Sequence, residues 1–359
     1  MPIDVNGPAP QGSGLYGLDT PVGEAKVVVL PVPFEATVSF SPGTARGPAA
    51  ILAASHQVDL LDADVGRPWE GGIAVDAGFP WLPALDRAAR EAACRCIDAV
   101  TAGRAGAPED QEIVEAAGQR VNREVTERCA ELLRESRIPV VVGGDHSVSY
   151  GAIAAAAAAM GERRLGVLHV DAHADLRDAY EGFMWSHASV MRNVVERMST
   201  VRLVQVGIRD FCDAEVEFIK AQPGRVTTYF DAHLRAARLA GQWSTVCAAI
   251  ANELPDNVYL SIDIDGLEPS QCPSTGTPVP GGLSFDELVA LVDVLVQAGK
   301  RIVGLDLVEV APDGSLTDVE LGSSWDGNVA ARLLYKLIGF ALISRGAPRP
   351  DLPRAPGIR

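Results

Sequence analysis

The sequence has no apolar run long enough to cross a membrane. A membrane-spanning helix needs roughly 18 or more apolar residues, and no stretch of the 359 residues approaches that length. The first residues, MPIDVNGPAPQGSG, are rich in proline and glycine and lack the charged-then-apolar order of a secretion signal. These absences predict a soluble, cytoplasmic protein with no membrane partner.

Paired cysteines and basic runs are also missing. The six cysteines are scattered and none forms a CxxC motif, which is typical of reduced residues in a cytosolic protein. The chain carries 47 acidic and 31 basic residues, a net charge of −16, and has no polybasic segment. This balance argues against nucleic acid or an anionic membrane as a partner, and it suits a cationic substrate.

Short β-branched runs recur along the chain, with helical patterns between them. Several of these runs are apolar on both faces, as in parallel strands that are covered by helices on both sides. The alternation predicts an α/β fold with one mostly parallel sheet of about eight strands. We predict strands at residues 26–32, 71–75, 138–143, 164–171, 201–208, 225–230, 257–265 and 301–310.

Helical patterns fill the intervals, for example at residues 111–136 and 150–160. The pattern at residues 284–299 opens with Ser284 and Glu287 in capping-box spacing.

The chain has no internal repeat and no linker long enough to divide it. We predict a single domain over residues 21–345. Residues 1–20 form a predicted N-terminal extension, and residues 346–359 form a Pro/Arg-rich tail.

Ionisable side chains gather where predicted strands end. In open α/β sheets, ligands bind beyond the carboxyl ends of the strands. His146 follows the strand at 138–143, and the segment VLHVDAHADLRDAYEG places Asp171, His173 and Asp175 at the end of the next one. These positions predict a functional site at one edge of the sheet.

Two later strands add carboxylates to the same edge. Within residues 257–265, Asp263 and Asp265 are expected to share one strand face by period-two alternation. Glu309 ends the apolar strand that begins at residue 301.

Six of these residues form a plausible ligand set for metal ions. They are His146, Asp171, His173, Asp175, Asp263 and Asp265. Six ligands without a thiolate are too many for one tetrahedral zinc. Four carboxylates and two imidazoles suit two divalent ions of the Mn²⁺ type, which would neutralise the carboxylates and lower the pKa of a bound water.

Other histidines and acids near these motifs have simpler interpretations. A single HxD or DxD is usually a loop or capping feature, and we expect Asp145 to cap the helix after it. His169 shares the strand face of Asp171, and we expect it to support the site rather than to bind metal.

The motifs GGDHS, DAHAD and SIDIDGLEP…TGTPVPGG closely resemble the signature blocks of the ureohydrolases, the family of arginase and agmatinase. The segments LPVPFEATVSFSPGTARGPAAIL and GLDLVEVAP resemble the first and last blocks, so the likeness covers nearly the whole chain. The resemblance implies the three-layer arginase-type fold, two Mn²⁺ ions per subunit and hydrolysis of a guanidinium group to urea and an amine. It also implies a homotrimer or homohexamer.

The resemblance assigns the six ligands to two ions. One ion would be held by His146, Asp171, Asp175 and Asp263. The other would be held by Asp171, His173, Asp263 and Asp265, so that Asp171 and Asp263 bridge.

Catalytic roles follow from the same resemblance. Asp175 would orient the attacking hydroxide, Glu309 would pair with the substrate guanidinium, and His187 would carry a proton to the departing amine. The second block usually reads DxDxxDP, whereas Glu268 takes the place of its last aspartate here.

The substrate is less clearly indicated. The segment after Asp175 resembles the agmatinase branch, and Arg177 replaces an asparagine that is typical of arginases. Arg177 is a candidate substrate-binding residue, because an arginine can pair with a carboxylate. Agmatine, cleaved to putrescine and urea in polyamine biosynthesis, is the first expectation. Aminopropylagmatine, guanidinobutyrate, arginine and formiminoglutamate are the alternatives.

Two other classes of protein are alternatives to a ureohydrolase. A catalytically silent metal-binding regulatory homologue would not need the complete set of ligands together with His187 and Glu309. A zinc-dependent deacetylase of related fold would need a ligand set for a single metal. The sequence favours the enzyme with two ions.

Overall fold

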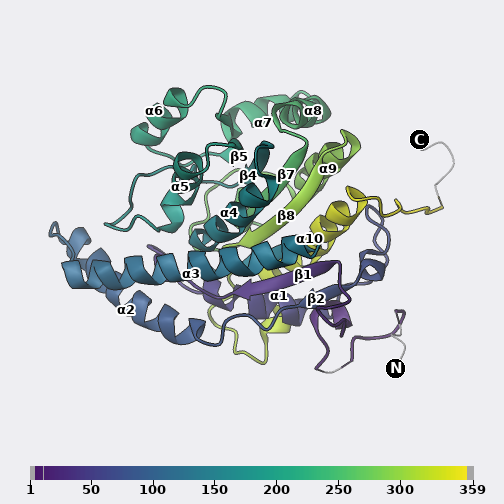
Figure 1. The fold of residues 1–359 in the computed structure, drawn as a ribbon, viewed down its shortest axis with the longest axis horizontal. Helices are drawn as coiled ribbons and strands as arrows, with labels where there is room; N and C mark the ends of the chain where they lie inside the picture. Colours follow the sequence, from purple (N-terminus) through teal and green to yellow (C-terminus); the bar gives the residue numbers. More distant parts are fainter. Residues whose placement is uncertain (1–4, 11, 354–359) are drawn as a thin grey trace.

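The structure is a computed structural model that describes residues 5–10 and 12–353. Its centre is one sheet of eight strands in the order β2-β1-β3-β8-β7-β4-β5-β6 (Figure 1). Every pair of neighbouring strands is parallel. The strands are β1 Val27–Val32, β2 Ile73–Val75, β3 Ile138–Gly143, β4 Leu165–Val170, β5 Val201–Ile208, β6 Val226–Phe230, β7 Asn257–Asp263 and β8 Arg301–Val308.

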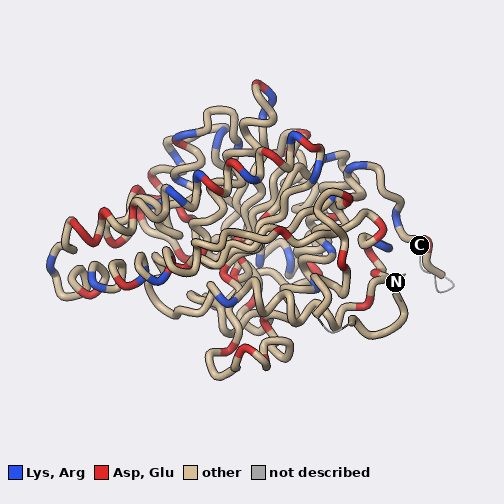
Figure 2. The backbone as a smooth tube through the Cα atoms, turned by 60° about the horizontal axis from the view of Figure 1, so that its bottom comes forward, with Lys and Arg blue, Asp and Glu red and all other residues tan. Residues whose placement is uncertain are grey.

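Helices cover both faces of this sheet, which confirms the predicted three-layer α/β fold. One layer contains α1 Gly47–Ser55, α7 Asp231–Leu239, α8 Trp243–Glu253, α9 Phe285–Gln297 and α10 Trp325–Ile343. The other contains α2 Leu82–Thr101, α3 Pro108–Arg134, α4 Ser149–Met160, α5 Val190–Arg197 and α6 Asp213–Ala221. Figure 2 shows acidic and basic residues interspersed along the outer helices.

Period-two alternation explains why these strands are apolar on both sides. In β4, Leu168 and Val170 pack with the α8–α10 layer, while Leu165 and Val167 pack with the α2–α6 layer. His169 therefore points to the α2–α6 side, and Asp171 continues on that side at the end of the strand. The alternation therefore places His169 and Asp171 on the same face of the sheet.

Several strand ends lie one or two residues from the predicted positions, and one of these differences affects the site. The strand predicted at residues 257–265 ends at Asp263, and Ile264–Gly266 forms a short 3-10 helix. The Asp263 side chain accepts a hydrogen bond from the backbone N–H of Asp265 at 2.9 Å. Because this cap turns the chain, the prediction that Asp265 shares the strand face of Asp263 is wrong. The capping box of Ser284 and Glu287 at the start of α9 is confirmed.

The N-terminal segment packs partly into the core. Leu15, Tyr16 and Leu18 are buried, and the Tyr16 hydroxyl donates to the carbonyl of Ala331 in α10 at 2.9 Å. The division into a domain and two extensions stays a prediction, and residues 1–4 and 354–359 of those extensions lie outside the described residues. No helix of the described chain is long and apolar enough to cross a membrane.

Candidate active site

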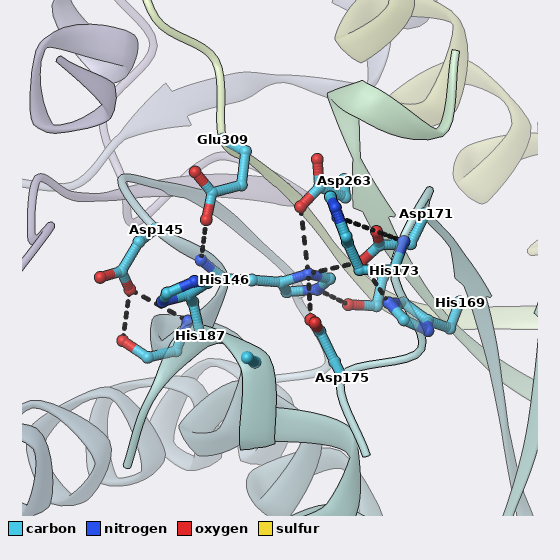
Figure 3. Close-up of polar contacts among 12 residues, drawn as sticks. Asp145, His146, His169, Asp171, His173, Asp175, His187, Asp263 and Glu309 are labelled. Atoms are coloured by element: carbon cyan, nitrogen blue, oxygen red, sulfur yellow. Dashed lines mark hydrogen bonds and ion pairs between the residues drawn. The ribbon is translucent and has the colours of Figure 1, made fainter. Parts of the chain in front are cut away.

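The predicted ligands meet at the carboxyl edge of the sheet. β3, β8, β7 and β4 are neighbours in that order, although they are far apart in the sequence. Because the strands are parallel, the residues that follow them come out at the same edge. His146, Asp171, His173, Asp175, Asp263 and Asp265 lie together there, and we refer to these six residues as the acidic cluster (Figure 3).

His146 is the centre of the first half of the acidic cluster. Its Nδ1 atom lies 3.1 Å from Oδ2 of Asp171, 3.2 Å from Oδ2 of Asp175 and 3.3 Å from Oδ2 of Asp263. Its Nε2 atom is held by the Ser261 hydroxyl at 3.0 Å. One ring nitrogen and three carboxylate oxygens thus converge on a small buried volume.

His173 is the centre of the second half. Its Nδ1 atom lies 3.4 Å from Oδ1 of Asp171 and 3.2 Å from Oδ2 of Asp265. Its Nε2 atom faces the Asp210 carboxylate at 3.9 Å. Asp171 directs one oxygen to each histidine, so it joins the two halves.

The charges of the acidic cluster fit divalent cations. Burial raises the pKa of Asp263, and the charges of Asp265 and Asp171 raise it further. Burial opposes a charge on His146, but hydrogen bonds from the ring to Asp171, Asp175 and Asp263 outweigh it and raise the pKa of the ring. Without bound cations, protons must therefore balance the negative charges of these carboxylates. Among the described residues, two groups of nitrogen and oxygen atoms lie close enough to hold an ion: one from His146, His169, Asp171 and Asp175, the other from Asp171, His173 and Asp265. Asp171 belongs to both groups, and Asp263 adjoins the first through its contact with His146.

His169 contacts the Asp171 carboxylate, and its supporting role stays a prediction. Its Nε2 atom donates to Asp171 Oδ2 at 2.8 Å, and the Gln205 amide donates to its Nδ1 atom at 3.0 Å. Burial lowers the pKa of His169, so the ring is neutral. These bonds orient the Asp171 carboxylate that both halves of the cluster share.

Two residues of the site have left-handed backbone conformations. Asp175 has φ 54° and Glu309 has φ 60°. Such angles are uncommon for residues other than glycine and often occur at functional sites.

Glu309 lies at the side of His146 away from His173 (Figure 3). Its Oε1 atom accepts the backbone N–H of His146 at 2.9 Å, and its Oε2 atom makes no hydrogen bond with the described residues. A Cβ at Gly276 would lie 3.4 Å from Oε2, so the glycine leaves room beside this oxygen. Burial and the charge of Asp145 raise the pKa of Glu309.

A cavity of about 310 Å³ opens beside the acidic cluster. His173, Asp175 and His187 are among the residues that line it. We refer to a further part of its lining as the cavity rim: Phe40, Arg177, Tyr180, Asp210 and residues 277–279. Phe40 is 78% exposed, and the Arg177 guanidinium lies over the Tyr180 ring at 4.8 Å.

His187 begins a short 3-10 helix, which Ser186 caps. Its ring packs edge-on against Tyr180, and its Nδ1 atom lies 3.2 Å from the Thr37 hydroxyl. Burial, followed by the charges of His173 and His146, lowers the pKa of His187 to about 3. The ring is therefore neutral near pH 7.

Glu268, the departure from the usual second block, does not reach the site. Its side chain is exposed, and its hydrogen bonds among the described residues are made by its backbone. The extra methylene is therefore accommodated at the surface. Asp145 caps the following helix as predicted, with Oδ1 accepting the N–H of Ser147.

Sequence reasoning missed several residues in and beside the cavity. Phe40, which lines the cavity, and Thr37, which contacts His187, belong to the segment LPVPFEATVSFSPGT, which was recognised as a block without a role for either residue. Asp210 follows β5, so a search of every strand end would have found it.

Comparison with protein families shows a match to the Arginase family over residues 25–338. The N(1)-aminopropylagmatine ureohydrolase of Thermus thermophilus is 34% identical over 91% of this chain and 94% of its own length. The agmatinase of Bacillus cereus is 30% identical over 80% of this chain and 84% of its own length.

A solved structure gives the same fold. The agmatine ureohydrolase of Thermoplasma volcanium superposes with a TM-score of 0.67 at 24% identity, covering 89% of this chain and 90% of the other.

Proposed function

The chain belongs to the arginase family, and on this basis we propose that it hydrolyses the guanidinium group of a small cationic compound to urea and an amine. The observation that carries this proposal is the acidic cluster at the strand ends, with Glu309 and a cavity beside it.

We propose that the acidic cluster holds two Mn²⁺ ions. His146, Asp171, Asp175 and Asp263 would hold one, and Asp171, His173, Asp263 and Asp265 would hold the other. Oxygen and imidazole donors without thiolate support manganese over softer metals. Bound there, the ions would neutralise the carboxylates and lower the pKa of a coordinated water.

Protein side chains supply the remaining steps. Glu309 would accept charge-assisted hydrogen bonds from the guanidinium and hold its carbon beside the acidic cluster, with Oε2 free for this purpose. Asp175 would orient the attacking oxygen. When the C–N bond breaks, the departing amine takes a proton. His187 on the cavity wall, which is neutral near pH 7, would take up the proton that the attacking water loses and deliver it to this amine.

Agmatine is the substrate that we propose first. Its tail ends in an ammonium, which suits the acidic chain, the Asp210 carboxylate (66% exposed) and the exposed ring of Phe40 at the cavity rim. N(1)-aminopropylagmatine is the second candidate. The relative named for that activity is more similar to this chain than the agmatinase, at 34% against 30% identity. Arg177 would contact the tail or, with an acidic compound such as guanidinobutyrate, its carboxylate.

Two further expectations accompany the enzyme. We propose that it works in the cytoplasm, where polyamines are made, and that it assembles as a homotrimer or homohexamer, as its family resemblance implies.

The test is urea release by the Mn²⁺-loaded protein, offered agmatine, N(1)-aminopropylagmatine, guanidinobutyrate, arginine and formiminoglutamate. We expect urea and amine in equal amounts from one of the two cationic amines. No urea from any guanidino compound, with two metal ions per chain confirmed by elemental analysis, would overturn the proposal. Formamide from formiminoglutamate would place the protein in another branch.

A further inference from the structure

A buried path of hydrogen bonds runs from Asp145 through Thr37 to His187. The Thr37 hydroxyl lies 3.1 Å from Asp145 Oδ2 and 3.2 Å from His187 Nδ1. The backbone N–H of His187 also donates to this hydroxyl, at 3.1 Å. Asp145 and Thr37 are buried, and Figure 3 shows the Asp145 carboxylate beside the His187 ring.

Each oxygen of Asp145 has two donors around it. Oδ1 receives the N–H of Ser147 at 3.1 Å and is contacted by the Ser147 hydroxyl. Oδ2 receives the N–H of Thr37 at 3.2 Å and faces the Thr37 hydroxyl. Since a carboxylate has about four acceptor positions, this arrangement is complete when both hydroxyls donate.

The Thr37 hydroxyl then has no proton left for His187. A hydroxyl has one hydrogen and two lone pairs. Its hydrogen goes to Asp145, and its first lone pair accepts the backbone N–H of His187. The remaining lone pair faces Nδ1 of the His187 ring, so this contact is a hydrogen bond only if Nδ1 carries the hydrogen. Nδ1 has a second contact, the Ser186 hydroxyl at 3.5 Å, but this lies at the limit of hydrogen-bond distance, so the shorter contact with Thr37 decides the tautomer.

We propose that Thr37, held by Asp145, is a positioning residue that fixes the neutral His187 ring in its Nδ1–H form. Nε2, which makes no hydrogen bond with the described residues, is then the ring atom that takes up and releases protons in the cavity. The catalytic consequence rests on the proposed function, whereas the tautomer is a property of the protein without substrate.

The path joins three segments that are separate in the sequence. Thr37 lies in the loop after β1, Asp145 follows β3, and His187 precedes α5. Glu35 and Asp86 fix the loop that carries Thr37, because Asp86 accepts the Glu35 N–H at 2.8 Å and Glu35 Oε2 accepts the N–H of Gly43 at 2.7 Å. The hydroxyl is therefore held in place independently of the acidic cluster.

The direct test is nitrogen NMR of the histidine rings in the metal-free full chain. The His187 signals are assigned by their loss in the His187→Ala variant. We expect a protonated Nδ1 and an unprotonated Nε2 in the parent protein and in Thr37→Ser, which keeps the hydroxyl. Thr37→Val has nearly the same shape without the hydroxyl, and it should populate the Nε2–H form.

Two results would overturn the proposal. One is an Nε2–H tautomer in the parent protein, which is measured without any variant and so does not depend on the folding of Thr37→Val. The other is an unchanged tautomer in a folded Thr37→Val. Neither result depends on urea release, so the proposal and the proposed function can fail separately.

Kinetics of the Mn²⁺-loaded enzyme give the second readout. Thr37→Val should lower kcat by roughly 10- to 100-fold, which reaches only the lower end of the ~10²–10⁴-fold contribution of general acid–base catalysis because the His187 ring itself remains. KM and metal content should stay unchanged, and Thr37→Ser should restore most of the rate. An equal loss in Thr37→Ser, or a change in KM alone, would contradict a role through the His187 ring.

Discussion

The residues of the acidic cluster end or closely follow buried strands, whereas the cavity rim lies on connecting segments, among which only Asp210 comes close after a strand. Asp171 and Asp263 follow or end the central strands β4 and β7, and the parallel register places them together. Phe40 and Arg177 lie on connecting segments, and Phe40 is largely exposed. The cluster is therefore constrained by the buried sheet, while the rim is held by contacts between connecting segments, such as the hydrogen bond from the Arg177 N–H to the carbonyl of Ala188.

This difference explains how one fold can serve several substrates. A change in the acidic cluster disturbs buried charges that must balance one another, as the raised pKa of Asp263 shows. A change at the rim replaces a side chain that faces solvent. Relatives that share the family but are named for agmatine or aminopropylagmatine are consistent with a variable rim over a constant cluster.

The largest effect is expected from His173→Ala in the acidic cluster. His173 is the only imidazole in the second half of the cluster, so the variant should lose one of two Mn²⁺ ions. Activity should fall by more than ~10²-fold, since even residues behind metal ligands contribute ~10–100-fold. Elemental analysis and urea release measure the two effects.

His187→Ala is the matched control for this experiment, because His187 lines the same cavity without belonging to the cluster. It should keep both ions and lose rate. Full activity in His173→Ala, or loss of metal in His187→Ala, would contradict the distinction between the two regions.

We expect an intermediate effect from Asp86→Asn, and this effect is on stability. Asp86 holds the loop that carries Thr37 by accepting the N–H of Glu35. Burial raises the pKa of Asp86 from 3.8 to about 6, with further contributions from the charges of Glu35 and Asp145. A raised pKa means that this carboxyl favours folding below pH 4 and that its contribution is lost as the pH rises through 6. At ~1.4 kcal/mol per pKa unit, this loss is at most about 3 kcal/mol.

The amide that replaces the carboxyl in this variant cannot ionise. The unfolding free energy of Asp86→Asn should therefore rise by up to about 3 kcal/mol relative to the parent between pH 4 and 7. Urea denaturation across this range measures the difference. Asp256→Asn is the control, because the Asp256 side chain is 96% exposed. If the unfolding free energies of Asp86→Asn and the parent change with pH in parallel, the pKa of Asp86 is not raised in the folded protein.

The smallest effect is expected from Glu268→Asp, which restores the usual residue of the second block. Since Glu268 is exposed, we expect a change of less than about 0.5 kcal/mol in stability and less than about twofold in urea release. A loss or gain of metal affinity in this variant would show that the loop after Asp265 controls the cluster.

Much of the architecture follows from the local pattern of residues. Apolar β-branched runs predicted all eight strands. Parallel strands are buried on both faces, so nearly all of their residues are apolar, and this composition can be recognised in the sequence. The boundary at Asp263 was missed, because a side-chain cap competes there with extended structure.

The candidate site was predictable only in part, and its residue assignments stay predictions. The acidic cluster was found because its members follow strand ends at short spacing in recognisable motifs. Thr37 was not found, because its role depends on Asp145 and His187, which are distant in the sequence. The pairing of β1 with β3 brings Thr37 to Asp145, and the packing of the segment before α5 adds His187.

The sequence by itself determined the alternation of strands and helices, the ligand types and their place at one sheet edge, because periodicity and residue chemistry are local properties. Only the tertiary structure decided which oxygen faces which ring nitrogen, that Glu268 points to solvent and that Thr37 lies between Asp145 and His187. Hydrogen-bond geometry depends on strand order and loop packing, and these form only when distant segments come together.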